Sequence, residues 1–441
     1  MSDVSSYLLA RKSSGEYEEA DRRDFSSKRI VVVAFNCKLV STPVRMNQRK
    51  GTGSTEFLIQ YLMSLFLCLS LNCHPYIKET KIPEDYIRVA IATGVNNFTF
   101  SSPGSFKVIS KEKYLKVGST KIDVTITDSV INLRLARGLA RIYDSVIYFI
   151  PESKIFRLGN RNYRGVLVFR SVQGQNFLIN ILTIEEYLQG VVPSEMGQID
   201  RELFEAIKAQ AVAARTYAYA HKGKYDNFGF DVYATVQDQV YDGMNVESEL
   251  VNRAIKKTKD QILVYQREPI EAKYHSTCGG RTANFSDIWG DSSPPYLTSV
   301  DDPFCKQSPH YRWETDISFS QLMKSLGYDS LRNERIKAIK LKRSTETGRV
   351  IEITVITSLR EEKIPKWKIR KVLAGEESLT GMLKSTYFDM KVTNGKIKIN
   401  GRGHGHGVGM CQYGAMGMAR AGYNYKKILK HYYPNTRLTR K

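Results

Sequence analysis

Apolar and polar residues alternate with a period of two along most of residues 86–183, the pattern of half-buried β-strands. The clearest runs are YIRVAIAT (86–93), KIDVTITD (121–128), VINLRLA (130–136), SVIYFIP (145–151), YRGVLVFRSV (163–172) and FLINILT (177–183). We therefore expect residues 86–180 to form an N-terminal, β-rich part of the protein.

The pattern becomes helical after residue 183. IEEYLQGVV (184–192) predicts one short helix, which Pro193 is expected to close. Residues 201–221 predict a long helix with Asp200 as its N-cap, and its many alanines indicate another element packed very close. Five residues form the expected buried stripe of that helix: Leu203, Ile207, Ala211, Ala214 and Ala218.

Shorter patterns complete the chain. Two strands separated by QREP, a helix at SFSQLMKSLGY, a hairpin over 336–357 that turns at 346–348, and two C-terminal helices follow in order. The predicted class is α+β, mostly antiparallel sheets with a few helices, in two lobes that form a substrate cleft. We expect the catalytic part to cover 181–441, with 315–385 as an inserted lobe.

The N-terminal region carries a targeting pattern. An almost unbroken apolar run of seventeen residues (57–73) follows the basic MNQRK (46–50), as in a secretory signal. This length is at the low end for a membrane span, so a retained anchor is the second interpretation of 46–80. Residues 1–45 are then a non-native upstream extension, or else a cytoplasmic tail before an anchor. We expect export to the periplasm or cell envelope, with membrane contact only through this segment.

The net charge indicates which classes of molecule the protein could bind, and the cysteines indicate which cross-links or metal sites it could contain. Sixty-six Lys and Arg against forty-five Asp and Glu give a net charge of +21, which favours nucleic acid, anionic lipid or an anionic wall polymer. The export pattern argues against nucleic acid. Three of the six cysteines lie beyond this segment, which allows one disulfide and a free thiol, or a metal site. These three are Cys278, Cys305 and Cys411.

Two segments carry candidate acid and base residues. Glu195 lies in VVPSEM, where apolar neighbours would raise a carboxyl pKa toward the value that a general acid needs. The ordinary alternative is a solvated glutamate. Arg215 and Tyr217 lie in AARTYA, where an arginine is either a buried ion-pair partner, the better supported choice, or a substrate clamp.

Two further segments carry histidines. In YHSTCGGRTANFSDIWG, His275 and Cys278 could bind zinc together with Cys305, and a Cys278–Cys305 disulfide is the equal alternative. If GRGHGHGVG (401–409) is extended, its histidines share one face and its glycines the other. His404 and His406 then suit either a metal or a polyhydroxylated ligand, and we favour the wall of a cleft.

Taken together, these segments resemble the stage II sporulation protein D (SpoIID) family. The resemblance rests on EEYLQGVVPSEM, EAIKAQAVAARTYAYAH, YHSTCGGRTANFSDIWG with PYLTSVDDP, KSTYF, and GRGHGHGVGMCQYGAMGMARAGYNYKKILKHYYPNT. They occur in the family's order and cover most of 87–436, whereas residues 1–80 lie outside it.

The resemblance implies a peptidoglycan lytic transglycosylase. Such an enzyme cleaves between N-acetylmuramic acid and N-acetylglucosamine in glycan strands without stem peptides, and leaves a 1,6-anhydro-muramyl end. The family's catalytic glutamate falls on Glu195. Glycan hydrolysis normally needs two carboxylates, whereas one that first donates and then accepts a proton is enough here. Peptide-free strands carry lactyl carboxylates, so the positive charge of the chain would attract them.

The resemblance also implies the surroundings of the acid. The expected substrate-binding residues are Arg215, Tyr217, His275, Ser276, Lys384, His404, His406, Gln412 and Tyr413. Some family members hold zinc through His and Cys residues and others do not, so no cofactor is expected for the chemistry and a structural zinc stays open. A peptide-stripping amidase is the expected partner. The alternative functions are a zinc-dependent envelope hydrolase and a non-catalytic wall-binding protein.

Overall fold

The computed structural model describes residues 29–35, 75–111, 113–118, 120–127, 130–135, 138–328, 334–374, 381–393 and 396–441. The chain divides into two units, Met1–Ile82 and Pro83–Lys441. In the first unit, β1 (Arg29–Phe35) pairs antiparallel with β2 (Pro75–Lys81). The predicted signal at 57–73 lies outside the described residues, as do Cys37, Cys68 and Cys73.

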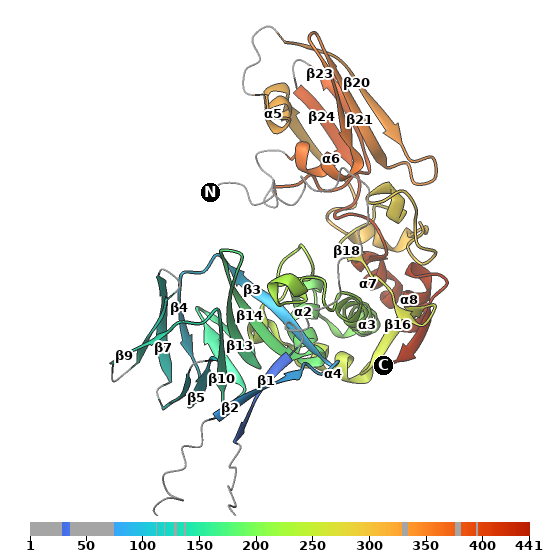
Figure 1. Ribbon diagram of the computed structural model, residues 1–441. Coiled ribbons are helices and arrows are strands. Elements are labelled where there is room, and N and C mark those ends of the chain that lie inside the picture. Colours follow the sequence, from blue (N-terminus) through green and yellow to red (C-terminus); the bar gives the residue numbers. More distant parts are fainter. Residues whose placement is uncertain are drawn as a thin grey trace, which may run out of the picture. The chain divides into compact units, whose positions relative to one another are not determined.

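Two sheets form the β-rich start of the second unit (Figure 1). The first has seven strands in the order β15-β3-β14-β13-β10-β5-β6: Val232–Tyr233, Tyr86–Thr93, Gln175–Thr183, Val166–Val172, Val146–Pro151, Phe106–Ile109 and Tyr114–Val117. The second has six strands in the order β12-β11-β4-β7-β8-β9: Arg161–Arg164, Ile155–Leu158, Asn97–Ser101, Lys121–Thr127, Val130–Leu135 and Gly138–Ile142. Neighbouring strands are antiparallel, except for the parallel pair β15 and β3.

The predicted alternation is confirmed in these strands. In β10, buried and partly buried residues alternate along the strand, as expected where one face of a sheet covers a core. In contrast, β14 is buried over six consecutive residues. Helix α2 (Ile184–Met196) follows β14 directly and contacts it, so this strand lies against protein on both faces.

Helices surround the functional site. They are α2, α3 (Phe204–Ala220), α4 (Glu249–Lys257), α7 (Gln412–Arg420) and α8 (Tyr425–Tyr432). Figure 1 shows α2 and α3 next to each other, and the two helices are in contact. The expected start of the long helix is confirmed: Asp200 caps a 3₁₀ turn (Arg201–Leu203) that leads into α3. All five residues of the predicted stripe are fully buried.

The expected helix end at Pro193 is wrong. Helix α2 continues to Met196 with Pro193 inside it, so Glu195 lies in the last helical turn rather than in a loop. The Ser194 hydroxyl donates to the Gly190 carbonyl at 2.8 Å, which satisfies an acceptor near the interruption. Gly197, with φ of 66°, ends the helix instead.

Small sheets and turns link these helices. Strands β17 (Glu268–Pro269), β16 (Gln261–Tyr265) and β26 (Arg437–Arg440) form one sheet. The hairpin predicted around QREP is found only in part: its second strand, β17, lies within QREP itself, and residues 270–273 after it are not a strand. Strand β18 (Tyr274–His275) pairs in parallel with β25 (Met410–Cys411). The other 3₁₀ turns are Asp226–Phe228, Gly243–Val246, Phe285–Asp287 and Pro303–Gln307.

Residues 313–401 have a second hydrophobic core of their own. One sheet has the order β19-β24-β23 (Trp313–Ser318, Lys396–Gly401, Phe388–Thr393), and the other has β20-β21-β22 (Ile336–Arg343, Val350–Thr357, Glu361–Pro365). Helices α5 (Phe319–Ser325) and α6 (Lys366–Val372) accompany them. The predicted hairpin over 336–357 is therefore confirmed.

The predicted mixture of antiparallel sheets and a few helices is confirmed, with seven α-helices among the described residues. Within that part of the chain, no helix combines the length and the apolar character that crossing a bilayer requires.

Candidate functional site

Glu195 lies in the last turn of α2, on a helix that is firmly held at both ends. A capping box between Thr183 and Glu186 fixes its start. At its end, the neighbours Val191, Val192 and Met196 are buried, whereas Glu195 itself is partly exposed. The backbone N–H of Val240 donates to Glu195 Oε1 at 2.8 Å. The carboxyl is therefore fixed in orientation and still reaches solvent.

Burial raises the pKa of Glu195 from 4.5 to about 7. The Val240 N–H and the neighbouring side chains of Gln412 and Tyr274 favour the ionised form and limit this rise, while Asp242 adds to it. Gln412 Nε2 is buried beside the carboxyl without a well-aligned hydrogen bond of its own. A carboxyl with a pKa near neutrality can both donate and accept a proton at working pH.

A chain of buried polar groups leads to this carboxyl. The Tyr187 hydroxyl donates to Gln239 Oε1 at 3.3 Å, and Gln239 Nε2 donates to the Tyr274 hydroxyl at 2.8 Å. Tyr274 therefore points toward Glu195 in a set position. Neither Gln239 nor Tyr274 was predicted as a site residue from the sequence. Tyr274 directly precedes the predicted His275, so its place in that motif is a usable signal, whereas nothing in the local pattern around Gln239 indicates its role.

Two of the predicted histidines, His275 and His406, come together next to Tyr274, whereas His404 packs against His310. The rings of His275 and His406 lie 5.4 Å apart, and Trp289 lies 5.0 Å from His406. Burial, with Arg349 nearby, lowers the pKa of His275 to about 3. Burial and neighbouring positive charges also lower the pKa of His404 to about 4 and that of His406 well below its ordinary value. These imidazoles are neutral at neutral pH and can both donate and accept hydrogen bonds.

The remaining predicted binding residues are placed by the same segments. The Tyr413 N–H donates to the Ser276 carbonyl at 3.1 Å, and Tyr413 follows Gln412 at the start of α7. Lys384 is exposed, and its charge helps to lower the pKa of His404. The structure thus gathers Gln412 beside Glu195, and Ser276 and Lys384 beside the histidines.

Tyr217 is less accessible than predicted. It is 6% exposed, and its hydroxyl donates to Asp238 Oδ1 at 2.9 Å. Lys273 Nζ lies 5.8 Å from the Tyr217 ring centre and 5.1 Å from that of Trp289. Lys273 and Trp289, both missed in the sequence analysis, therefore place a cation and an aromatic face beside His406.

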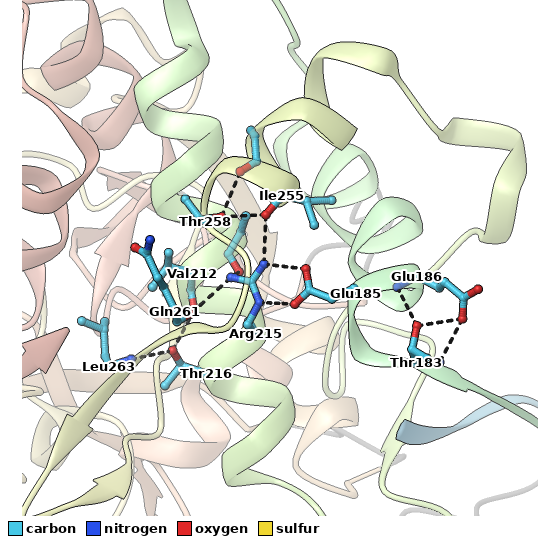
Figure 2. Close-up of polar contacts among 12 residues, drawn as sticks. Thr183, Glu185, Glu186, Val212, Arg215, Thr216, Ile255, Thr258, Gln261 and Leu263 are labelled. Carbon is cyan, nitrogen blue, oxygen red and sulfur yellow. Dashed lines mark hydrogen bonds and ion pairs between the residues drawn. The ribbon is translucent and has the colours of Figure 1, made fainter. Parts of the chain in front are cut away.

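Arg215 is placed differently from the predicted substrate-binding residue. It is fully buried and forms a two-pronged ion pair with Glu185 (Nε–Oε1 2.6 Å, Nη2–Oε2 3.0 Å; Figure 2). It also donates to the carbonyl oxygens of Gln261 and Ile255. Arg215 thus joins α2, α3, α4 and β16, and a substrate cannot reach it.

The stretch at 402–409 is not the extended strand that was expected. Gly403, Gly405, Gly407 and Gly409 all have positive φ, so the backbone turns at every second residue. The small residues let the chain segment 273–278 approach, as a Cβ on Gly409 would lie 2.1 Å from the Lys273 carbonyl oxygen. Packed protein therefore occupies the space beside these glycines.

Replacing Gly409 by alanine should destabilise the protein by about 2–5 kcal/mol, because it combines a strained φ with overpacking against Lys273. Gly422 has a similar φ of 83°, but no atom lies within 4 Å of its added Cβ. Gly422→Ala should cost only about 1 kcal/mol. Urea unfolding of both variants tests this, and equal losses would show that close approach contributes nothing.

The three cysteines of the second unit are buried free thiols, so the structure does not contain the predicted Cys278–Cys305 disulfide. The Sγ atoms of Cys278 and Cys305 lie 3.5 Å apart. The metal ligand set also differs from the prediction: the group consists of Cys278, Asp302, Cys305 and Cys411. His275 is not a member of this group, and its Nδ1 lies 3.1 Å from the Val408 carbonyl oxygen. Asp302 was not predicted, although it lies only three residues before Cys305.

The chain is similar in sequence to proteins of a known family. Residues 173–265 match the family described as "Stage II sporulation protein", a range that contains Glu195 and Arg215. The chain is 33% identical over 284 residues to stage II sporulation protein D of Bacillus subtilis and covers 76% of that protein. The chain belongs to the SpoIID family.

Two further proteins are similar to this chain over a longer stretch. An uncharacterized protein of Brachyspira hyodysenteriae is 31% identical over 351 residues, which is 79% of this chain and 92% of that protein. The amidase enhancer of Bacillus subtilis is 30% identical over 498 residues, 94% of this chain and 69% of that protein. Residues 302–409 match a domain of unknown function (DUF8618), so most of the part with the second core has its own relatives.

Proposed function

We propose that this SpoIID-family protein is a lytic transglycosylase of the cell envelope, acting on peptidoglycan strands without stem peptides. The observation that carries the proposal is the carboxyl of Glu195, which has a pKa of about 7, accepts a hydrogen bond from the Val240 N–H and lies beside Gln412 and Tyr274. Family membership and the relative named amidase enhancer fit a cell-wall role and an envelope location. An amidase that strips the peptides is then the proposed partner.

The proposed reaction needs only this one acid. The Glu195 carboxyl gives its proton to the glycosidic oxygen as the C1–O4 bond breaks. The 6-hydroxyl of the same muramyl residue then attacks C1, and its proton returns to the Glu195 carboxylate. Atoms and protons balance without water. The Val240 N–H keeps Oε1 in place throughout, so the same group is oriented for both transfers.

Residues of the neighbouring segments would bind the glycan strand. Neutral His404 would hydrogen-bond sugar hydroxyls. His406, whose Nδ1 accepts a hydrogen bond from the Val408 N–H at 3.1 Å, would pack beside the Trp289 face that covers apolar ring carbons. Lys384 and Lys273 place positive charge near them for the lactyl carboxylates. The proposed substrate trough runs along these residues, past the exposed side of Glu195.

Hydrolysis is the competing reaction. Asp242 is the carboxylate whose charge acts on Glu195, and it is engaged by Ser194 at 2.8 Å and by Arg161 at 2.8 Å. A two-carboxylate hydrolase would use it as the base. A catalytic zinc hydrolase is less well supported, because the four grouped metal-binding side chains are all buried and a catalytic site needs an open position.

Digestion of peptide-free glycan strands in heavy-oxygen water separates these functions. The transglycosylase should release anhydro products that are one water lighter than hydrolytic products and carry no heavy oxygen. A hydrolase of either kind would incorporate one heavy oxygen per cleavage. Strands that bind and remain intact would instead indicate a non-catalytic wall-binding protein.

A further inference from the structure

Four buried side chains from three segments converge near the candidate site. Cys278 follows β18, Asp302 and Cys305 belong to the 3₁₀ turn at Pro303–Gln307 and its cap, and Cys411 caps α7. All four are 0% exposed, and their ligand atoms lie within 4.8 Å of one another. Three thiols and one carboxyl at this spacing form a ligand set that suits zinc.

We propose that Cys278, Cys305, Cys411 and Asp302 bind one zinc ion in a closed, structural site. This zinc neither activates a nucleophile nor acts as a Lewis acid. Tetrahedral zinc with Zn–S bonds of about 2.3 Å places its sulfur ligands about 3.8 Å apart. Here the Cys278 and Cys305 sulfurs lie 3.5 Å apart, and Cys278 Sγ lies 3.1 Å from Asp302 Oδ2. The side chains are thus close to the required spacing.

The backbone around the group is arranged for thiolates. The N–H groups of Cys278 and Gly414 both point at Cys411 Sγ at 3.3 Å. Those of Gly279 and Gly280 are directed at the Cys305 sulfur. Phe304 N–H holds Asp302 Oδ1 at 2.9 Å, which leaves Oδ2 facing the cysteines. Such N–H donors stabilise negative charge on metal-bound sulfur and oxygen.

A buried arginine provides independent support. Arg349 is 1% exposed, and its Nε and Nη1 have no hydrogen-bond partner; the Asp287 carboxylate acts on it through its charge, but no ion pair joins Arg349 to a carboxylate among the described residues. Its Nη2 donates to the Cys278 carbonyl at 2.8 Å. An unpaired buried cation is costly. Three thiolates and a carboxylate around a divalent ion keep two negative charges, and Arg349 lies where it offsets one of them.

The proposed site would support the acid without taking part in the chemistry. Cys411 directly precedes Gln412, whose side chain lies beside Glu195, and Cys278 lies just beyond the histidine strand β18. Zinc would lock the start of α7 against that strand. This role is independent of the reaction proposed above, because it predicts metal in an inactive protein as well.

Zinc content of the full chain, purified without chelator, tests the inference. We expect about one zinc per chain for the unaltered protein, for Glu195→Gln and for His275→Ala. Cys411→Ser and Asp302→Asn should lower zinc retention about tenfold or more under the same dialysis. Replacement of zinc by cobalt should give a thiolate-to-cobalt absorption band that Cys305→Ser weakens.

Thiol labelling of the unaltered protein keeps the test valid even if the cysteine variants do not fold. The three thiols should resist alkylation until a chelator removes the metal, and then all three should react. The inference is overturned by a metal-free chain with a mass two hydrogens lower, which means a disulfide. It is equally overturned if His275→Ala loses zinc while Cys411→Ser retains it.

Discussion

Glu195→Gln should lower kcat/KM for peptide-free glycan strands by about 10²–10⁴-fold, because glutamine cannot give or take the proton. The substitution keeps the size and the Val240 contact of the side chain, so the fold should survive. The measurement is the rate of product release, read by mass spectrometry. Glu202→Gln is the matched control, since that side chain is 78% exposed on the turn before α3. Equal rates for the two variants would remove Glu195 from the mechanism.

The Glu195 carboxyl should also determine how kcat/KM and protein stability depend on pH. With a folded pKa of about 7, the acid form needed for the first step is lost above neutrality, so kcat/KM should fall about tenfold per pH unit there. Because the pKa is raised on folding from 4.5, its contribution to stability is present below the unfolded value and is lost as pH rises through 7. Glu195→Gln should therefore reduce the loss of stability between about pH 5 and about pH 8.

Arg215→Ala should destabilise the fold by about 3–5 kcal/mol, since it breaks a buried ion pair and removes the donors to Gln261 and Ile255. Arg253→Ala on α4 is the control, because that arginine is exposed and should change stability by less than about 0.5 kcal/mol. Chemical denaturation measures both losses.

Kinetics separate this structural role from substrate binding. At a temperature at which Arg215→Ala is still folded, its KM for glycan strands should equal that of the unaltered protein, because Arg215 is fully buried. A raised KM with unchanged stability would instead show that Arg215 binds the substrate.

Short-range patterns predicted the elements well. Asp200 as a cap, the buried stripe of α3 and the hairpin over 336–357 depend on residues within one or two turns of each other, and all three are found. Pro193 is the exception. Its fixed φ fits a helix, so the last turn of α2 continues past it, and the side chain of Ser194 engages a nearby carbonyl.

The candidate site could be predicted only in part. Glu195 and the histidines were identified because each lies in a motif with apolar or glycine neighbours that already restrict its surroundings. The positions of Gln239 and Trp289 follow from loops that meet only in the folded chain. Repeated glycines correctly indicated the close approach of another backbone or a ligand, and the folded chain decides between the two: the approaching group at Gly409 is the protein's own backbone at Lys273.

By itself, the sequence determined the element types and the family and indicated Glu195 as the candidate acid, since periodicity, capping and ordered motifs are local properties of the chain. Tertiary structure alone decided the partners of polar side chains. Arg215 donates a hydrogen bond to Glu185, which lies 30 residues away in the sequence. The Cys278 N–H donates to the sulfur of Cys411, which lies 133 residues away. A buried charge or thiol is stabilised by whichever groups the fold brings to it, and neighbours in sequence do not specify those groups.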